Sequence, residues 1–252
     1  MPSTKDVDRP RAAVDVARSY LRRERPLSAL VVLIAVALFL GAYVATSLLP
    51  AIAVAVVLVV AARAPLLGSS GTVRLRTDET PDAVVEAFLG PTPPVLGLQW
   101  GIADEVLTHD EGEPHGRSAT DVEGEPESED EPYDERGTGS EVATYRVSYL
   151  FGFRSVRMAV RSREEPAPDG VRRVEVEVTA DGHPWATYTA TIGRGDGRAD
   201  GRTTVDVAYT ADRRFGLRRV PQQWIATRYR DDVLAAQGYT VVERDAGFGL
   251  LA

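Results

Sequence analysis

The chain offers few side chains for catalysis or metal binding. Its 252 residues include no cysteine, which excludes disulfides, thiolate metal sites and cysteine nucleophiles. The three histidines are His109 and His115, in a polar acidic stretch that offers no preorganised ligands, and His183, beside Asp181-Gly182 in a predicted turn. No Ser-His-Asp arrangement, phosphate loop or dinucleotide fingerprint can be assembled from the sequence. We therefore expect no catalytic residue, no metal and no cofactor.

Aromatic side chains are the more informative set, because they fall on predicted strands and on a predicted long helix. Some of them must form the core, and tyrosine or tryptophan in a cavity wall can also orient a ligand through its polar tip. The set is Trp100, Tyr145, Tyr149, Trp185, Tyr188, Tyr209, Trp224 and Tyr229.

These aromatics are positioned by elements that the sequence pattern predicts. Gly68-Ser69-Ser70-Gly71 indicates a flexible joint, followed by a strand at 71–76, a helix at 80–89 and a strand at 96–107. Five further strands, at 142–150, 155–163, 171–179, 184–192 and 203–210, are separated by short Gly- or Pro-containing turns, which favours an antiparallel meander. A long helix at 221–238 carries a predicted apolar stripe that includes Trp224, and 239–242 can form a short edge strand or a docked tail.

The charge is unevenly distributed along the chain. Residues 108–141 hold 13 acidic residues and two arginines, which gives −11, whereas the whole chain has a net charge of −8. This insert has no apolar periodicity, so we expect it to be disordered. The acidity argues against non-specific nucleic-acid binding. Arginine outnumbers lysine 28 to 1; a GC-rich genome explains that bias, and a halophilic source explains both the acidity and the scarcity of lysine.

A run of 36 residues without a charge, 27–62, indicates membrane insertion. One helix of that length would measure about 54 Å, too long for a hydrocarbon core of about 30 Å. Thr46 to Pro50 supplies a break, so we expect two spans at about 27–46 and 49–67, with residues 1–26 as a basic segment. That segment could lie along the inner membrane surface or form a solvated juxtamembrane helix. Arginines flank both ends of the run, so the positive-inside rule places both termini and the soluble part, 68–252, in the cytoplasm of a plasma-membrane protein.

The order of elements resembles the helix-grip fold of the START/SRPBCC superfamily, which includes polyketide cyclase-like proteins. The residues that carry the resemblance are Thr72–Leu89 and Thr203–Gly238, together with the strands between them. The resemblance implies an α+β domain in which a curved antiparallel sheet wraps a long C-terminal helix. It also implies an apolar cavity between the two, lined by members of the aromatic set given above. The acidic insert, the tail after the helix and the membrane hairpin depart from that pattern.

Three functions follow as hypotheses. The first is a non-enzymatic membrane-anchored domain that binds a hydrophobic or lipid-like molecule, with membrane lipids as partners. The second is a structural or adaptor protein with a filled core and no ligand. The third is a cyclase- or hydrolase-like enzyme that works in the cavity. Protein partners and the identity of a ligand are not specified by the sequence.

Overall fold

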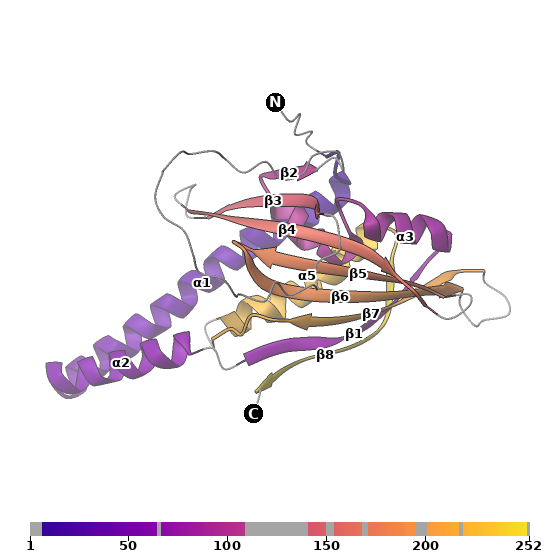
Figure 1. Ribbon diagram of the computed structural model, residues 1–252. Helices are drawn as coiled ribbons and strands as arrows, with labels where there is room; N and C mark the ends of the chain where they lie inside the picture. Colours follow the sequence, from indigo (N-terminus) through magenta and orange to yellow (C-terminus); the bar gives the residue numbers. More distant parts are fainter. Residues whose placement is uncertain are drawn as a thin grey trace, which may run out of the picture.

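The computed structural model describes residues 7–64, 67–108, 141–149, 154–167, 171–194, 201–216 and 219–250 (Figure 1). Most of the predicted acidic insert, residues 109–140, lies outside these ranges. The elements in chain order are α1 (Arg11–Ala45), α2 (Leu48–Arg63), β1 (Leu67–Thr77), α3 (Pro81–Leu89), a 3-10 turn η1 (Pro94–Leu96), α4 (Gly97–Ile102), β2 (Glu105–Thr108), β3 (Glu141–Tyr149), β4 (Arg154–Glu165), β5 (Arg172–Ala180), β6 (His183–Arg194), β7 (Thr203–Ala211), α5 (Val220–Ala236) and β8 (Thr240–Leu250).

The strands form one antiparallel sheet of eight, in the order β2-β3-β4-β5-β6-β7-β1-β8. The meander expected from the short turns is confirmed. In β5 every second residue faces the core, and Val174, Val176 and Val178 are buried. The turn into β6 uses Asp181 and Gly182 with φ angles of 50° and 79°, a positive pair typical of tight hairpins. β2 and β3 pair directly, with Thr108 opposite Ala143, so the insert connects two neighbouring strands.

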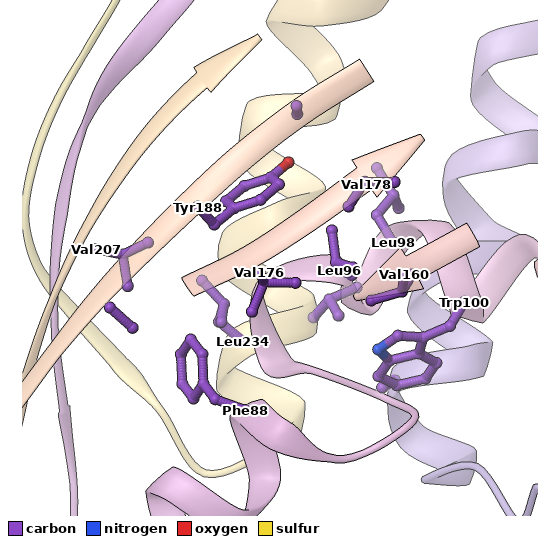
Figure 2. Packing of buried hydrophobic residues seen from close by; sticks show 14 of the residues in the cluster. Phe88, Leu96, Leu98, Trp100, Val160, Val176, Val178, Tyr188, Val207 and Leu234 are labelled. Atoms are coloured by element: carbon purple, nitrogen blue, oxygen red, sulfur yellow. The ribbon is translucent and has the colours of Figure 1, made fainter. Parts of the chain in front are cut away.

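Helices cover the inner face of this curved sheet and close the core. Helix α3 lies within the predicted helix at 80–89: Thr80 Oγ1 accepts a hydrogen bond from the Ala83 amide at 3.3 Å, and Pro81 is the first helical residue. Figure 2 shows buried side chains from the strands, α3, η1, α4 and α5 meeting in one interior, among them Phe88 and Trp100, which are both fully buried. The fold is therefore α+β, as predicted.

Helix α1 joins the apolar segment to this core without a break at Pro26. Its first part packs on α4 and α5, with Ala13, Ala17 and Tyr20 buried. This finding replaces both expectations for the basic segment, the membrane surface and a solvated helix. A close approach explains the contact, because an added Cβ on Gly101 of α4 would lie 2.6 Å from the Ala17 Cβ. The first part of α1 thus belongs to the domain core.

The apolar region forms the distal half of α1 and all of α2, which contacts it (Figure 1). Helix α1 is long and apolar enough to cross a membrane, and α2 is a shorter apolar helix. Large apolar side chains of both helices, such as Val44 and Leu49, are more than 80% exposed within the protein. The helical structure is interrupted between α1 and α2 at Thr46 and Ser47, within the predicted break from Thr46 to Pro50.

Two local predictions were wrong. Residues 68–71 are not a joint but part of β1, which pairs with β7 and β8 on both sides. Residues 97–102 form helix α4 rather than a strand. A third prediction was partly right: the tail after α5 is an edge strand, but β8 has 11 residues and extends well beyond the predicted 239–242.

Candidate functional site

A cavity of about 110 Å³ lies between the inner face of the sheet and α5. Its walls come from β1, β6, β7, β8, α5, the turn η1 with the start of α4, and the segment that connects β7 to α5. The apolar and aromatic wall residues are Val73, Leu75, Val95, Leu98, Trp185, Ala186, Tyr188, Val207, Tyr209, Ala211, Phe215, Val233 and Leu234.

Strand periodicity aims these side chains inward. In β7 the buried or half-buried positions Val205, Val207 and Tyr209 alternate with more exposed neighbours such as Ala208. The register pairs Tyr188 of β6 with Tyr209, and their rings stack with centroids 6.1 Å apart. Figure 2 shows Tyr188 and Val207 on the strands facing the side of α5 that carries Leu234. The sheet wall is therefore set by the same alternation that builds the core.

The opposite wall depends on a close contact of α4 with α5. An added Cβ on Gly97 would lie 2.3 Å from Cγ1 of Val233 and 2.7 Å from the Gln237 side-chain nitrogen. The Gln237 amide also donates to the Pro94 carbonyl at 3.3 Å. Glycine at position 97 thus allows η1 and α4 to close one end of the cavity.

Five arginines line the cavity as well: Arg213, Arg214, Arg219, Arg230 and Arg244. Arg244 forms an ion pair with Asp231, and its Nε atom is buried without a hydrogen-bond partner. Burial raises the pKa of the Tyr188 hydroxyl, while the nearby Arg230 charge acts in the opposite direction. The hydroxyl is therefore neutral and can donate a hydrogen bond at physiological pH.

The predicted aromatic set divides between the cavity and other places. Trp185, Tyr188 and Tyr209 lie in the cavity wall. Trp100 and Tyr145 are fully buried elsewhere, where their polar atoms donate to the Pro93 and Pro91 carbonyls at 3.0 and 2.8 Å.

Of the remaining three aromatics, Tyr229 and Trp224 do not line the cavity, and Tyr149 cannot be placed. Tyr229 is buried against α1, with its ring centroid 5.7 Å from that of Tyr20. Tyr149 ends β3, and its side chain is outside the described set. Trp224 is 75% exposed, so its predicted place on the apolar stripe of the long helix was wrong. It lies nine residues, about two and a half turns, before the buried Val233, which places the two on opposite faces of α5.

The arginines are the site residues that the aromatic pattern missed. Arg213-Arg214 and Arg219 form a basic cluster between β7 and α5, whereas residues 68–252 are almost neutral outside the insert. This local excess of positive charge was the sequence signal that could have indicated these site residues. Within the described ranges, no three His, Cys, Asp or Glu side chains gather in a way that could hold a metal ion. His183 is exposed at the β5–β6 turn, and the other two histidines lie outside those ranges.

Comparison with known proteins assigns no family. No family model matches the chain, and no curated protein matches it. Among solved structures, a protein from Rhizobium loti is 18% identical, with a TM-score of 0.32 over 68% of this chain and 98% of that one. A protein from Rhizobium leguminosarum is 12% identical, with a TM-score of 0.29 over 67% and 96% of the two chains. Both are structural-genomics structures without an assigned activity.

Proposed function

We propose that this protein is a membrane-anchored domain that binds a hydrophobic or lipid-like molecule in the cavity between the sheet and α5. The observation that carries the proposal is the cavity itself, in which apolar and aromatic walls are combined with a few polar groups, as in small-molecule sites generally. Anchoring keeps such a domain close to its ligand and raises the effective concentration of both.

The fold supports a helix-grip assignment within the START/SRPBCC superfamily. In the sheet, β1 lies next to β7 at the end of the meander, and α5 packs over the inner face beside the cavity. The strand β8, which follows α5 and extends the sheet beyond β1, departs from the pattern that the resemblance implies.

The membrane anchor is proposed to be a two-span hairpin. The uncharged part of α1, residues 27–45, measures about 28 Å, and the 16 residues of α2 measure about 24 Å. Both lengths approach the hydrocarbon thickness of about 30 Å, and α2 can be matched by local thinning of the bilayer. Basic residues at both ends of the hairpin support the further proposal, by the positive-inside rule, that the termini and the domain after the hairpin lie in the cytoplasm of a plasma-membrane protein.

This arrangement is tested by reporter fusions. A reporter fused before Met1 and one fused after Ala252 should each be active only on the cytoplasmic side. A C-terminal reporter that is active outside the cell would contradict the orientation.

Ligand binding is tested by extraction of the full chain in a mild neutral detergent, followed by mass spectrometry of co-purifying lipids. Ala211 faces the cavity and Ala208, on the opposite face of the same strand, is exposed. Ala211→Phe should therefore abolish co-purification, whereas Ala208→Phe should leave it unchanged.

A structural or adaptor role with no ligand is the second candidate, because a cavity of about 110 Å³ is smaller than a typical site of about 300–1,000 Å³. That role requires that no lipid co-purifies with the unmodified chain, with Ala211→Phe or with Ala208→Phe. An enzyme in the same cavity stays a third hypothesis, for which the described wall supplies no carboxylate or histidine.

A further inference from the structure

The charge of the cavity wall is opposite to that of the protein. The chain carries a net charge of −8, yet the described lining contains five arginines and no acidic residue. One of these arginines, Arg244, is partly neutralised by Asp231. A concave surface lined by one sign of charge concentrates ions of the opposite sign, so the wall favours an anion.

Three of the arginines lie at one end of the cavity. Arg213, Arg214 and Arg219 are exposed, and none of them forms an ion pair with an acidic side chain in the described ranges. Guanidinium groups without internal partners are suited to bind carboxylate or phosphate oxygens, often through two hydrogen bonds at once. The other end of the cavity is closed by apolar residues such as Leu75, Val207 and Val233.

The arginine end adjoins the base of the apolar hairpin. Phe215 and Leu67 exchange two backbone hydrogen bonds, of 3.1 and 2.8 Å, immediately after α2. An added Cβ on Gly216 would lie 2.2 Å from the Ala62 carbonyl oxygen, so this segment touches the last turn of α2. In the proposed membrane arrangement, the arginine end of the cavity therefore lies at the bilayer surface.

The position of Trp224 agrees with a bilayer surface at the arginine end of the cavity. Helices α1 and α5 contact each other and run in opposite directions (Figure 1), and Tyr20 packs against Tyr229. Trp224 comes five residues, about 7.5 Å, before Tyr229, on the side of Leu27, where the uncharged run begins. An exposed tryptophan at the start of an apolar span is typical of a membrane interface.

We infer that the cavity takes an anionic amphiphile from the adjoining bilayer leaflet, with its carboxylate or phosphate group held by Arg213, Arg214 and Arg219 and part of its chain against the apolar wall. The inference rests on the proposed lipid-binding function of this cavity. A cavity of about 110 Å³ encloses only a segment of a long chain, since an engineered cavity of about 150 Å³ holds one benzene molecule. The remainder of the chain stays in the bilayer beside the open end.

The test uses the full chain in phosphatidylcholine nanodiscs that contain hexadecyl phosphate, hexadecanoate or hexadecanol at equal mole fractions. After exchange into neutral detergent, native mass spectrometry counts the molecules retained on the protein. We expect both anions to be retained at least tenfold more than the alcohol, and to be released as salt is raised. Inorganic phosphate at millimolar concentration should not displace them.

Variants separate the arginine site from general effects of charge. Arg213→Gln with Arg214→Gln should lower retention of both anions at least tenfold and leave hexadecanol unchanged, whereas the two lysine substitutions at these positions should preserve most of the binding. Arg157→Gln with Arg194→Gln is the matched control, since both are exposed arginines outside the cavity wall. This control should bind as the unmodified chain does.

The possible failures are distinguishable. If hexadecanol is retained as well as the anions and the glutamine variant changes nothing, the anion preference is refuted while lipid binding stands. If inorganic phosphate at millimolar concentration displaces the probes, the site binds a small anion and the amphiphile is refuted. If no probe is retained, the proposed function fails together with this inference.

Discussion

Helix α1 is attached to the rest of the domain in part through its contact with α4, and this contact can be tested by adding the isopropyl side chain of valine at Gly101. An ideal Cβ on Gly101 lies 2.6 Å from the Ala17 Cβ, whereas non-bonded carbons prefer about 3.5–4.0 Å. Gly101→Val therefore forces the helices apart by roughly 1 Å or more. Overpacking of this kind costs about 1–3 kcal/mol, and the better helix propensity of valine over glycine returns only a few tenths.

The assay is urea unfolding of the full chain in detergent micelles, followed by tryptophan fluorescence. Trp100 precedes Gly101 and is fully buried, so its exposure on unfolding contributes to the fluorescence change. We expect Gly101→Val to lower the free energy of unfolding of the protein by about 2 kcal/mol. Gly193→Val is the matched control, because nothing lies within 4 Å of an added Cβ there and valine favours a strand.

A double-mutant cycle then identifies the partner. Ala17→Gly alone should cost about 1 kcal/mol through helix propensity, but in the Gly101→Val background it should recover part of the loss, since it removes the clashing Cβ. Additive effects of the two substitutions, or an unchanged midpoint for Gly101→Val, would refute the close packing of α1 against α4 at these two residues.

Three further predictions concern the domain itself. Tyr145→Phe removes the donor to the part-buried Pro91 carbonyl at 2.8 Å, so urea unfolding should show a loss of about 1 kcal/mol; an unchanged midpoint would contradict the stated bond. Burial, with a smaller contribution from Glu79, raises the pKa of Tyr239 to about 12 from 10.0. The unfolded state then loses its proton first, so stability should be intact below pH 10 and fall as the pH rises from 10 to 12, and Tyr239→Phe should flatten that part of the profile. Because Thr108 and Ala143 are paired, replacing residues 109–140 with a short Gly-Ser turn should change the free energy of unfolding by less than about 1 kcal/mol, whereas collapse of the domain would show that the insert packs.

The meander and the capped helix α3 were predictable because local signals decide them. Alternating valines in β5 face a buried side, and Thr80-Pro81 supplies both a cap and a helix start. These patterns need no knowledge of distant residues. The pairing of β8 beside β1 was not predictable in the same way, since glycines interrupt its sequence and the backbone of β1 provides the register.

Helix α4 shows where prediction of secondary structure from the local sequence fails. Residues 96–107 combine branched apolar residues with Trp100, a composition that favours a strand. The two glycines of α4 have poor helix propensity, yet they allow α5 and α1 to approach within van der Waals distance on either side. The helix is therefore selected by tertiary packing, which an amino-acid pattern within six residues does not record.

The stripe on α5 was misread for a geometric reason. Trp224 and Tyr229 were assigned to one face, but the buried positions are Ala226, Tyr229, Val233 and Leu234, which follow the spacing of three and four residues. Size and apolarity alone placed Trp224 in the core. Its exposure instead leaves a large amphipathic side chain at the end of α5 that is closest to the start of the apolar run of α1.

The net charge of the chain does not reveal the positive charge of the cavity wall, because it sums over regions of opposite charge. The insert contributes −11 to a chain of −8, so the remainder is weakly positive as a whole. Within that remainder, the five wall arginines are spread from Arg213 to Arg244 over a loop, a helix and an edge strand. Only the return of β8 to the sheet, after α5 has crossed its inner face, brings Arg244 into the wall that Arg213 and Arg219 begin. An electrostatic site of this kind is a property of the topology, and a charge count over a linear window misses it even when every residue in it has been counted.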